Sequence, residues 1–191
     1  ADYAAASRSF ESAARLANDP TEQLVNWRRA GTASLEGGAA DDAVRGFKAY
    51  LEITFDEGVA LSLVRAYVTV GAHSEAAGAC ERFLAREGIS AVFRTAVLTE
   101  LLYVQHALGR YAAAYAVAVE LIKLSADDRF IHEAAHNARL GGMLDRSAKL
   151  YKESLKRRFD PEVAMDYHYV QKARGLDNDA ISLLKRVIGA G

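Results

Sequence analysis

The side chains with the clearest potential for chemistry form the sequence His132-Glu133-Ala134-Ala135-His136. Two histidines four residues apart lie on one face of a helix, where both can bind the same Zn²⁺ ion. The glutamate between them can then act as a general base that activates a metal-bound water. The motif therefore raises the hypothesis of zinc-dependent hydrolysis.

A catalytic zinc site needs a third protein ligand, and the sequence supplies a poor one. The extended motif has Gly three residues after the second His, but Arg139 occupies this position, and His168 lies far along the chain. Glu153, 17 residues after His136, is the plausible carboxylate ligand, and we expect it on an outward face of the next helix. A zinc metalloprotease is therefore the weaker alternative. We predict no catalytic residue, no bound metal and no cofactor.

No other stretch has the residue types and spacing of a catalytic or nucleotide-binding motif. The sequence lacks a Gly-rich phosphate loop, a pair of cysteines and a Ser-His-Asp set. The single Cys80 is expected to be a small buried hydrophobe in a helix. His106 and His168, each next to or near a tyrosine, are expected to be ordinary structural histidines. We predict that the chain is not an enzyme.

The composition indicates a helical protein without a general affinity for nucleic acid or membranes. Hydrophobic residues make up 51% of the chain, and both prolines, Pro20 and Pro161, follow an Asp at points where one helix must end and the next begin. The net charge of −1 gives no argument for nucleic-acid binding. No apolar run reaches the roughly 18 residues of a transmembrane helix. We therefore expect neither nucleic-acid binding nor direct membrane insertion.

A pair of helices recurs along the chain. Between Leu24 and Asp56, Trp27 and Gly31 stand four residues apart in a first helix, and a second helix follows after Glu36-Gly37-Gly38-Ala39. A small residue followed four residues later by an apolar or bulky one marks each second helix, at steps of 33 to 38 residues. These pairs are Ala6/Phe10, Ala43/Phe47, Ala76/Cys80, Ala114/Ala118, Ser147/Tyr151 and Ala180/Leu184. We expect Gly31 and Ala43 to let the two helices of their pair approach closely.

These repeats resemble the tetratricopeptide repeat (TPR) family, whose unit has about 34 residues and two helices. Trp27, Gly31, Ala43 and Phe47 match the family's Trp-Gly-Ala-Phe-Ala pattern, with Tyr50 near the last place. The other residues that carry the resemblance are Tyr67, Gly71, Ala76 and Phe83, Gly109-Arg110-Tyr111 with Ala114, Asp2-Tyr3 with Ala6 and Phe10, Gly141-Gly142, and Gly175. The resemblance implies an all-α fold, a right-handed superhelical solenoid of antiparallel helix pairs similar to bacterial TPR arrays.

The repeat divides the chain into six segments. Residues 1–20 are expected to be the second helix of a truncated repeat, and TPR-like repeats follow at 21–56, 57–90, 91–126, 127–160 and 161–191. Helices are expected at 2–18, 22–36, 40–54, 57–70, 73–86, 91–108, 111–124, 128–140, 144–157, 162–174 and 177–188. The leading half repeat and the apolar last helix indicate part of a longer array or assembly, since solenoids need polar caps at their ends.

In the TPR family the first helices line a concave groove, and the resemblance implies which side chains point into it. With Trp27 as the fourth place, the second, fifth, ninth, twelfth and thirteenth places face the groove, beginning with Val25, Arg28, Thr32, Leu35 and Glu36. The predicted partner-binding residues are Arg28, Leu61, Arg65, Tyr103, His106, Arg129, His132, His136, Arg139, Met165, Tyr169 and Lys172. Cations outnumber acids in this set, so we expect an acidic protein or peptide partner. The alternative is an ordinary solvated basic face.

A TPR subclass that clamps acidic chaperone C-termini needs Asn, Lys or Arg at the sixth place of its first helices. Only Arg29 could serve, because the other sixth places hold Ser62, Glu100, Glu133 and Asp166. We therefore predict a different, non-catalytic scaffold that binds a partner protein or peptide in a basic concave groove. The alternative is a periplasmic TPR segment of a bacterial exopolysaccharide exporter or secretion machine that recruits an enzyme or guides polymer. The sequence is compatible with the cytoplasm and with the bacterial periplasm.

Overall fold

The computed structural model describes residues 2–189, and every regular element within them is an α-helix. The helices are α1 (Tyr3–Leu16), α2 (Pro20–Glu36), α3 (Ala40–Ile53), α4 (Glu57–Thr69), α5 (His73–Leu84), α6 (Ala91–Ala107), α7 (Tyr111–Leu124), α8 (Arg129–Leu140), α9 (Leu144–Arg157), α10 (Pro161–Ala173) and α11 (Asp177–Gly189). The all-α prediction is confirmed, and the predicted helix ends differ from these by two residues or fewer. None of these helices has the length and apolar character needed to span a bilayer.

Within each helix pair, the first and second helices begin by different local chemistry. Three first helices start at an aspartate whose side chain accepts a backbone N–H bond: Asp19 caps α2, Asp56 caps α4 and Asp160 caps α10. Pro20 and Pro161 take the first helical position, where proline's fixed φ fits and its missing N–H costs nothing. Each second helix after α1 begins two residues beyond a left-handed glycine (φ 68° to 76°): Gly38, Gly71, Gly109, Gly142 and Gly175.

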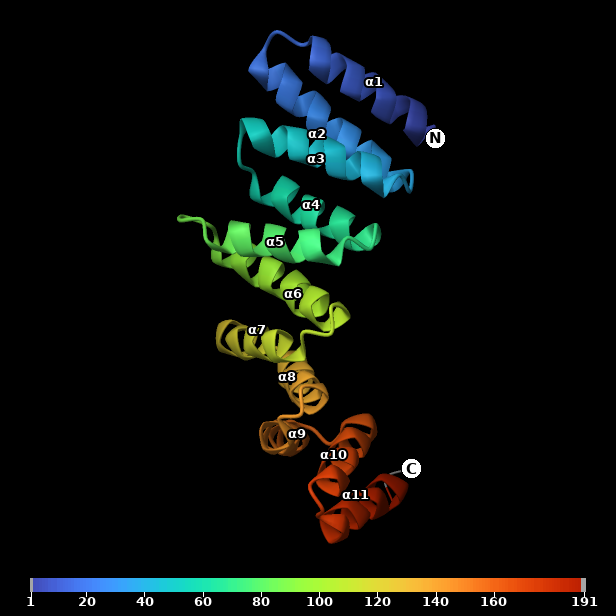
Figure 1. Cartoon of the computed structure of the whole chain (residues 1–191), viewed down its shortest axis with the longest axis vertical. Coiled ribbons are helices and arrows are strands. Elements are labelled where there is room, and N and C mark those ends of the chain that lie inside the picture. Colours follow the sequence, from blue (N-terminus) through green and yellow to red (C-terminus); the bar gives the residue numbers. More distant parts are fainter. Residues whose placement is uncertain (1, 190–191) are drawn as a thin grey trace. The chain divides into compact units, whose positions relative to one another are not determined.

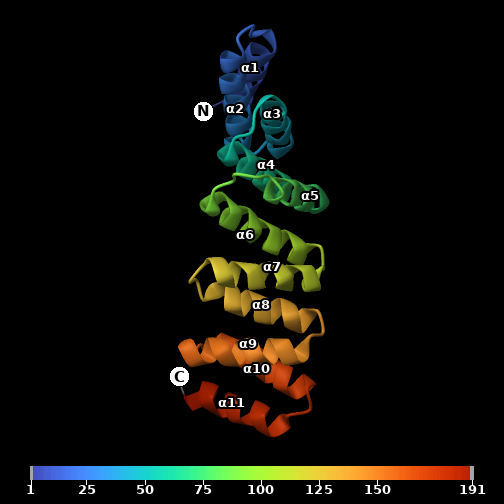
Figure 2. The ribbon, with the colours of Figure 1, turned by 90° about the vertical axis from the view of Figure 1, so that its left-hand side faces the viewer.

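The chain divides into two compact units, Ala1–Glu100 and Leu101–Gly191. In unit 1, consecutive helices from α1 to α5 pack against one another (Figure 1). In unit 2, α7 to α11 pack in the same consecutive manner, and α8 also touches α10 (Figure 2). Even-numbered helices are the first helices of the repeats, and odd-numbered helices are the second helices. First helices two apart in number therefore become neighbours, as α8 and α10 are.

Two glycines bring the backbones of α2 and α3 together. A Cβ atom added to Gly46 would lie 2.8 Å from the backbone nitrogen of Gly31 and 3.0 Å from its Cα. Gly31 is covered in turn by the ring of Phe47, which a Cβ on Gly31 would meet at 2.6 Å. The prediction that Gly31 admits a close neighbour is confirmed, but its backbone partner is Gly46 rather than Ala43. Ala43 is fully buried one turn earlier on the same face.

The small residues that mark the second helices form the buried seam of each helix pair. Ala43, Ala76, Ala114 and Ser147 have no exposed surface. Cys80 is fully buried as well, and burial raises the pKa of its thiol to about 12. The predicted packing role of Cys80 is therefore confirmed.

Candidate functional site

Residues predicted to face the groove come together from two successive first helices in unit 2. Tyr103 and His106 of α6 and His132, Glu133 and His136 of α8 line an open cleft of about 310 Å³, which we call the histidine cleft. Spacings of three and four residues keep each pair on one helical face, as the sequence predicted. Four of the five lining residues belong to the predicted binding set. Glu133 is the fifth, and it occupies a sixth place.

A buried asparagine fixes the position of His106 in this cleft. The side-chain nitrogen of Asn137 donates to the carbonyl of Glu133 at 2.9 Å, so its Oδ1 faces His106 Nδ1, also at 2.9 Å. Because Oδ1 only accepts, His106 carries its hydrogen on Nδ1. The ring of His106 stacks on His136 with 5.6 Å between centroids. Asn137, which is fully buried, thus holds α6 and α8 in register.

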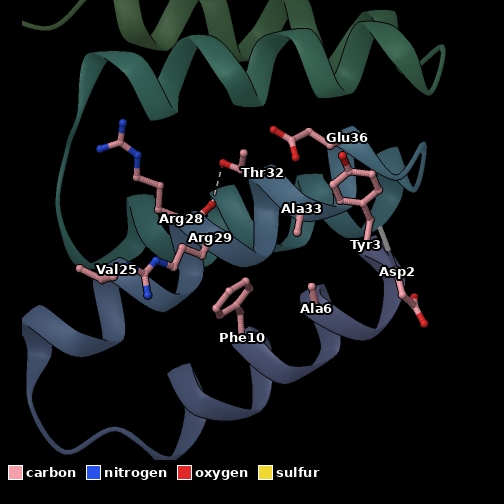
Figure 3. Close-up of a pocket in the computed structure, with 10 residues that line it drawn as sticks. All are labelled: Asp2, Tyr3, Ala6, Phe10, Val25, Arg28, Arg29, Thr32, Ala33 and Glu36. Carbon is pink, nitrogen blue, oxygen red and sulfur yellow. Dashed lines mark hydrogen bonds between the residues drawn. The ribbon is translucent and has the colours of Figure 1, made fainter.

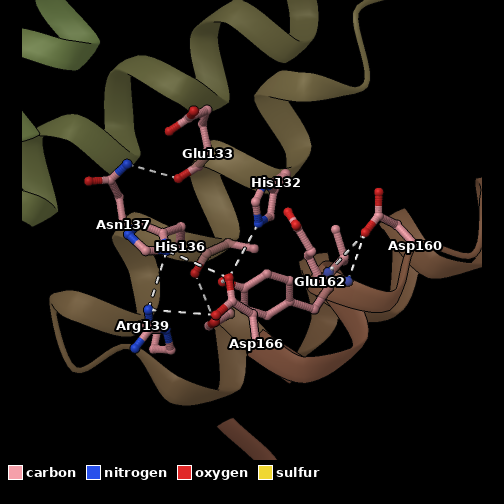
Figure 4. A network of polar contacts seen from close by, with 12 residues as sticks. His132, Glu133, His136, Asn137, Arg139, Asp160, Glu162 and Asp166 are labelled. Carbon is pink, nitrogen blue, oxygen red and sulfur yellow. Dashed lines mark hydrogen bonds and ion pairs between the residues drawn. The ribbon is translucent and has the colours of Figure 1, made fainter. Parts of the chain in front are cut away.

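A second set of polar contacts joins α8 to α9 and α10 around Asp166 (Figure 4). One carboxylate oxygen of Asp166 accepts a bond from the hydroxyl of Tyr151 at 3.2 Å and lies 3.4 Å from His132 Nε2. The other oxygen lies 3.9 Å from a guanidinium nitrogen of Arg139. Burial, reinforced by the negative charge of Asp166, raises the pKa of Tyr151, so its hydroxyl stays protonated and donates. Asp166 therefore organises one side of the histidine cleft.

The surroundings of His136 favour its neutral form. Burial and the neighbouring Arg139 cation lower the pKa of His136, while the more distant carboxylate of Asp166 opposes this effect. Nη2 of Arg139 lies 3.3 Å from His136 Nδ1, and a guanidinium only donates, so Nδ1 is the acceptor. The 3.8 Å separation between His136 Nδ1 and Asp166 is consequently not a salt bridge at neutral pH.

The arrangement supplies no third ligand for zinc. Glu153, the ligand considered from sequence, accepts a bond from Arg157 at 2.9 Å and is half exposed, on the outward face that we expected. His132 contacts Asp166, and His136 accepts from Arg139. Among residues 2–189, no group of three or more His, Cys, Asp or Glu side chains is placed to hold a metal ion.

Acidic side chains partly neutralise the predicted cations. These acids lie outside the second, fifth, ninth, twelfth and thirteenth places that were assigned to the groove. Arg65 of α4 donates to Glu100 of α6 at 2.8 Å, and Arg129 pairs with Asp127 at 3.2 Å. Arg139 is opposed by Asp166 as described above. Glu100 and Asp166 both occupy sixth places of first helices. The sixth-place acids thus reduce the basic character expected from the sequence.

The remaining predicted residues lie apart from the histidine cleft. Leu61 and Met165 are half-buried, and Tyr169 and Lys172 are exposed on α10. His168 donates from Nδ1 to the carbonyl of Ala180 at 2.9 Å, which confirms its structural role.

A larger open cleft lies between α1 and α2 in unit 1, with a volume of about 580 Å³ (Figure 3). We call it the N-terminal cleft. Four side chains of the predicted groove line its α2 side: Val25, Arg28, Thr32 and Glu36. Its other lining residues are Arg29 and Ala33 of α2 and Asp2, Tyr3, Ala6 and Phe10 at or in α1. The contribution of α1 to this cleft was not predicted from the sequence, although the leading half repeat was the signal that could have revealed it.

Comparison with known proteins identifies the fold. No family model and no curated protein match the sequence. A solved structure of MamA MSR-1 matches with a TM-score of 0.70 and 21% identity, over 87% of this chain and 95% of that one. MamA is a TPR-like protein. The chain has the fold of a TPR-like array.

Two further MamA structures give the same result. One matches with a TM-score of 0.75 and 16% identity, over 88% of this chain and 92% of that one. MamA from Desulfovibrio magneticus RS-1 matches with a TM-score of 0.71 and 12% identity, over 87% and 93%. In this TPR-like array the histidine cleft lies between the first helices of two successive repeats, α6 and α8.

Proposed function

We propose that the chain is a non-catalytic protein-interaction scaffold that binds a partner protein or peptide on its first helices. The observation that carries this proposal is the histidine cleft, where Tyr103, His106, His132 and His136 surround one open space. Contacts with Asn137, Asp166 and Arg139 hold the histidines in place, so little side-chain entropy is lost when a partner binds.

Two exposed tyrosines supply the contact area for such a partner in unit 2. Tyr103 is 41% exposed at the histidine cleft, and Tyr169 is 54% exposed on α10. Tyrosine gives a large and rigid contact at low entropic cost, which is why it is frequent at the centre of binding surfaces. Half-buried Met165 adds apolar surface on the same helix as Tyr169.

A preference for acidic partners is the finer part of the proposal. Arg65, Arg129 and Arg139 already face carboxylates. Of the predicted binding residues, all of which lie within the described range, Arg28 and Lys172 are exposed cations without an ion pair and are open to a carboxylate-bearing partner. A charge reversal at Arg139 would place a carboxylate beside Asp166, so Arg28 and Lys172 are the better positions for testing this preference.

The test is capture of a partner by the tagged chain from lysate and from envelope fractions. The Tyr103→Ala/Tyr169→Ala variant removes the proposed contacts, while Leu124→Ala/Ile181→Ala removes residues of 49% and 50% exposure from the second helices α7 and α11. We expect the tyrosine variant to reduce capture by about 10-fold or more, and the control to retain it. Equal capture by both variants, or loss only with the control, would contradict the proposal. Placement in an exopolysaccharide exporter or secretion machine stays a prediction, which enrichment from the envelope fraction would favour.

A further inference from the structure

Side chains of successive first helices meet through a pair of places that recurs along the chain. The acid at the sixth place of one first helix faces the ninth place of the first helix before it. Glu100 of α6 accepts a bond from Arg65 of α4 at 2.8 Å, and Asp166 of α10 lies 3.8 Å from His136 of α8. Arg65 and His136 are both ninth places, three residues after a sixth place. These two acids therefore face a nitrogen-bearing side chain of the same chain.

Glu133 of α8 is the sixth-place acid to which this arrangement brings no cation. The ninth place of the preceding first helix is Tyr103, and both side chains line the histidine cleft. The basic side chains of α8 converge on Asp166, and Glu133 points away from that carboxylate (Figure 4). Among residues 2–189, no ion pair involves Glu133. Its carboxylate is thus available to a group from outside the chain.

The histidines of the cleft do not oppose a cation there. His106 donates from Nδ1 to Asn137 at 2.9 Å, which leaves Nε2 of the neutral ring as an acceptor. Burial and a neighbouring guanidinium lower the pKa of His136 and favour its neutral form. His132 lies 3.4 Å from Asp166, so a proton gained by this ring would be balanced by that carboxylate. Together with the sixth-place carboxylate, these groups leave the cleft without net positive charge.

The bond between Arg65 and Glu100 shows how a sixth-place acid can hold a guanidinium. Glu133 occupies the equivalent place in the next first helix, and the Tyr103 ring, 41% exposed, lines the same open space of about 310 Å³. A guanidinium can pair with a carboxylate and stack on an aromatic ring at the same time. Helices precede α6 and follow α8, so this cleft is an internal feature of the array.

We propose that the histidine cleft binds an arginine side chain of the partner protein, whose guanidinium pairs with Glu133 and stacks on the ring of Tyr103. Nε2 of His106 supplies a further acceptor for the guanidinium. This inference rests on the proposed scaffold function and names the group that is recognised at this cleft. It concerns a different place from Arg28 and Lys172, where the partner is expected to carry carboxylates.

The probe is N-acetylarginine amide, with N-acetylcitrulline amide as its neutral isostere and N-acetylglutamate amide as the ligand of opposite charge. Each is titrated into the whole chain, and NMR follows the ring signals of histidine and tyrosine. We expect the arginine amide to shift the signals of Tyr103, His106 and His136 saturably. It should bind at least about 5-fold more tightly than the citrulline amide, because the uncharged group loses the charge-assisted pair with Glu133. Added salt should weaken this binding.

Glu133→Gln keeps the shape of the side chain and removes its charge, so it should abolish the preference for arginine over citrulline. Glu120→Gln is the matched control, since it makes the same change on the exposed surface of α7, away from the cleft. It should leave the preference unchanged. Circular dichroism verifies that each variant is folded.

Four results would overturn the inference: no saturable shift of the three rings, equal binding of arginine and citrulline amides, tighter binding of the glutamate amide, or an unchanged preference in Glu133→Gln. Self-association of the chain that the arginine amide reverses would also overturn it, because a second copy would then supply the cation. The capture experiment separates this inference from the scaffold proposal. Capture that is lost in Tyr103→Ala/Tyr169→Ala but retained in Glu133→Gln would overturn the inference and leave the scaffold proposal intact.

Discussion

Replacing Gly46 with alanine should destabilise unit 1, even though alanine is the better helix former. In the middle of a helix, the change from Gly to Ala by itself contributes about 1 kcal/mol in favour of folding. At Gly46, however, the new methyl carbon would lie 2.8 Å from the backbone nitrogen of Gly31, roughly 0.6 Å inside an ordinary contact. Backbone atoms cannot rotate away as a side chain can. Helices α2 and α3 must therefore move apart.

Such overpacking typically costs about 1–3 kcal/mol, and separation of the helices also loosens the contact of Phe47 with Gly31. The two effects together predict a net loss of about 1–2 kcal/mol in the free energy of unfolding of unit 1. Gly78→Ala is the matched control, because a Cβ at this position in α5 would meet only the end of the Arg82 side chain, at 3.5 Å. It should stabilise the chain by about 0.5–1 kcal/mol.

Urea unfolding followed by circular dichroism gives both changes, and amide hydrogen exchange locates the effect. Exchange should accelerate in α2 and α3 of Gly46→Ala and slow slightly in α5 of Gly78→Ala. A Gly46→Ala variant that is stabilised as much as Gly78→Ala would refute the close approach of the two backbones.

Two further predictions concern titratable groups. Because the pKa of His136 is lowered from 6.5, the unfolded chain binds more protons than the folded one below about pH 6.5, so the stability of unit 2 should fall as the pH drops through this region. His136→Gln, which can still accept a bond from Arg139, should flatten this dependence in urea titrations between about pH 7.5 and pH 5, and identical slopes for both proteins would argue against a neutral His136. Cys80, fully buried and with its pKa raised to about 12, should react with Ellman's reagent about 100-fold or more slowly in the native protein than in urea. Complete native labelling at the rate of the unfolded chain would show that this helix pair is open.

The sequence was sufficient for the positions of the helices, since Asp-Pro junctions and turn glycines act locally. It also identified Tyr103, His106, His132 and His136 as neighbours on one face, because helical spacing and the repeat determine that face. It did not reveal Gly46, because the TPR-like pattern draws attention to Gly31 and Ala43. The close approach of the α2 and α3 backbones instead depends on Gly46, one turn after Ala43.

The sequence did not reveal the acids that face the predicted cations, and the reason is specific. The five places taken from the TPR family omit the sixth, where Glu100 and Asp166 meet Arg65 and Arg139. Which side chains meet across helices depends on how closely and at what angle the helices pack. A single sequence does not give this packing geometry directly. Tyr151 illustrates the point, since its position on α9 predicts burial but not its bond to Asp166.

The five left-handed glycines that precede second helices have a consequence for how such a chain can change in evolution. Steps of 33 residues separate Gly38 from Gly71, Gly109 from Gly142, and Gly142 from Gly175. A duplication or deletion of one such block rejoins identical turns, so recombination can alter the number of repeats without creating a strained junction. The order of the repeats is more constrained than their number, because the bonds of His106 to Asn137 and of His132 to Asp166 form only between particular neighbouring repeats. The turns thus permit the number of repeats to change, while the contacts between first helices determine which repeats can be neighbours.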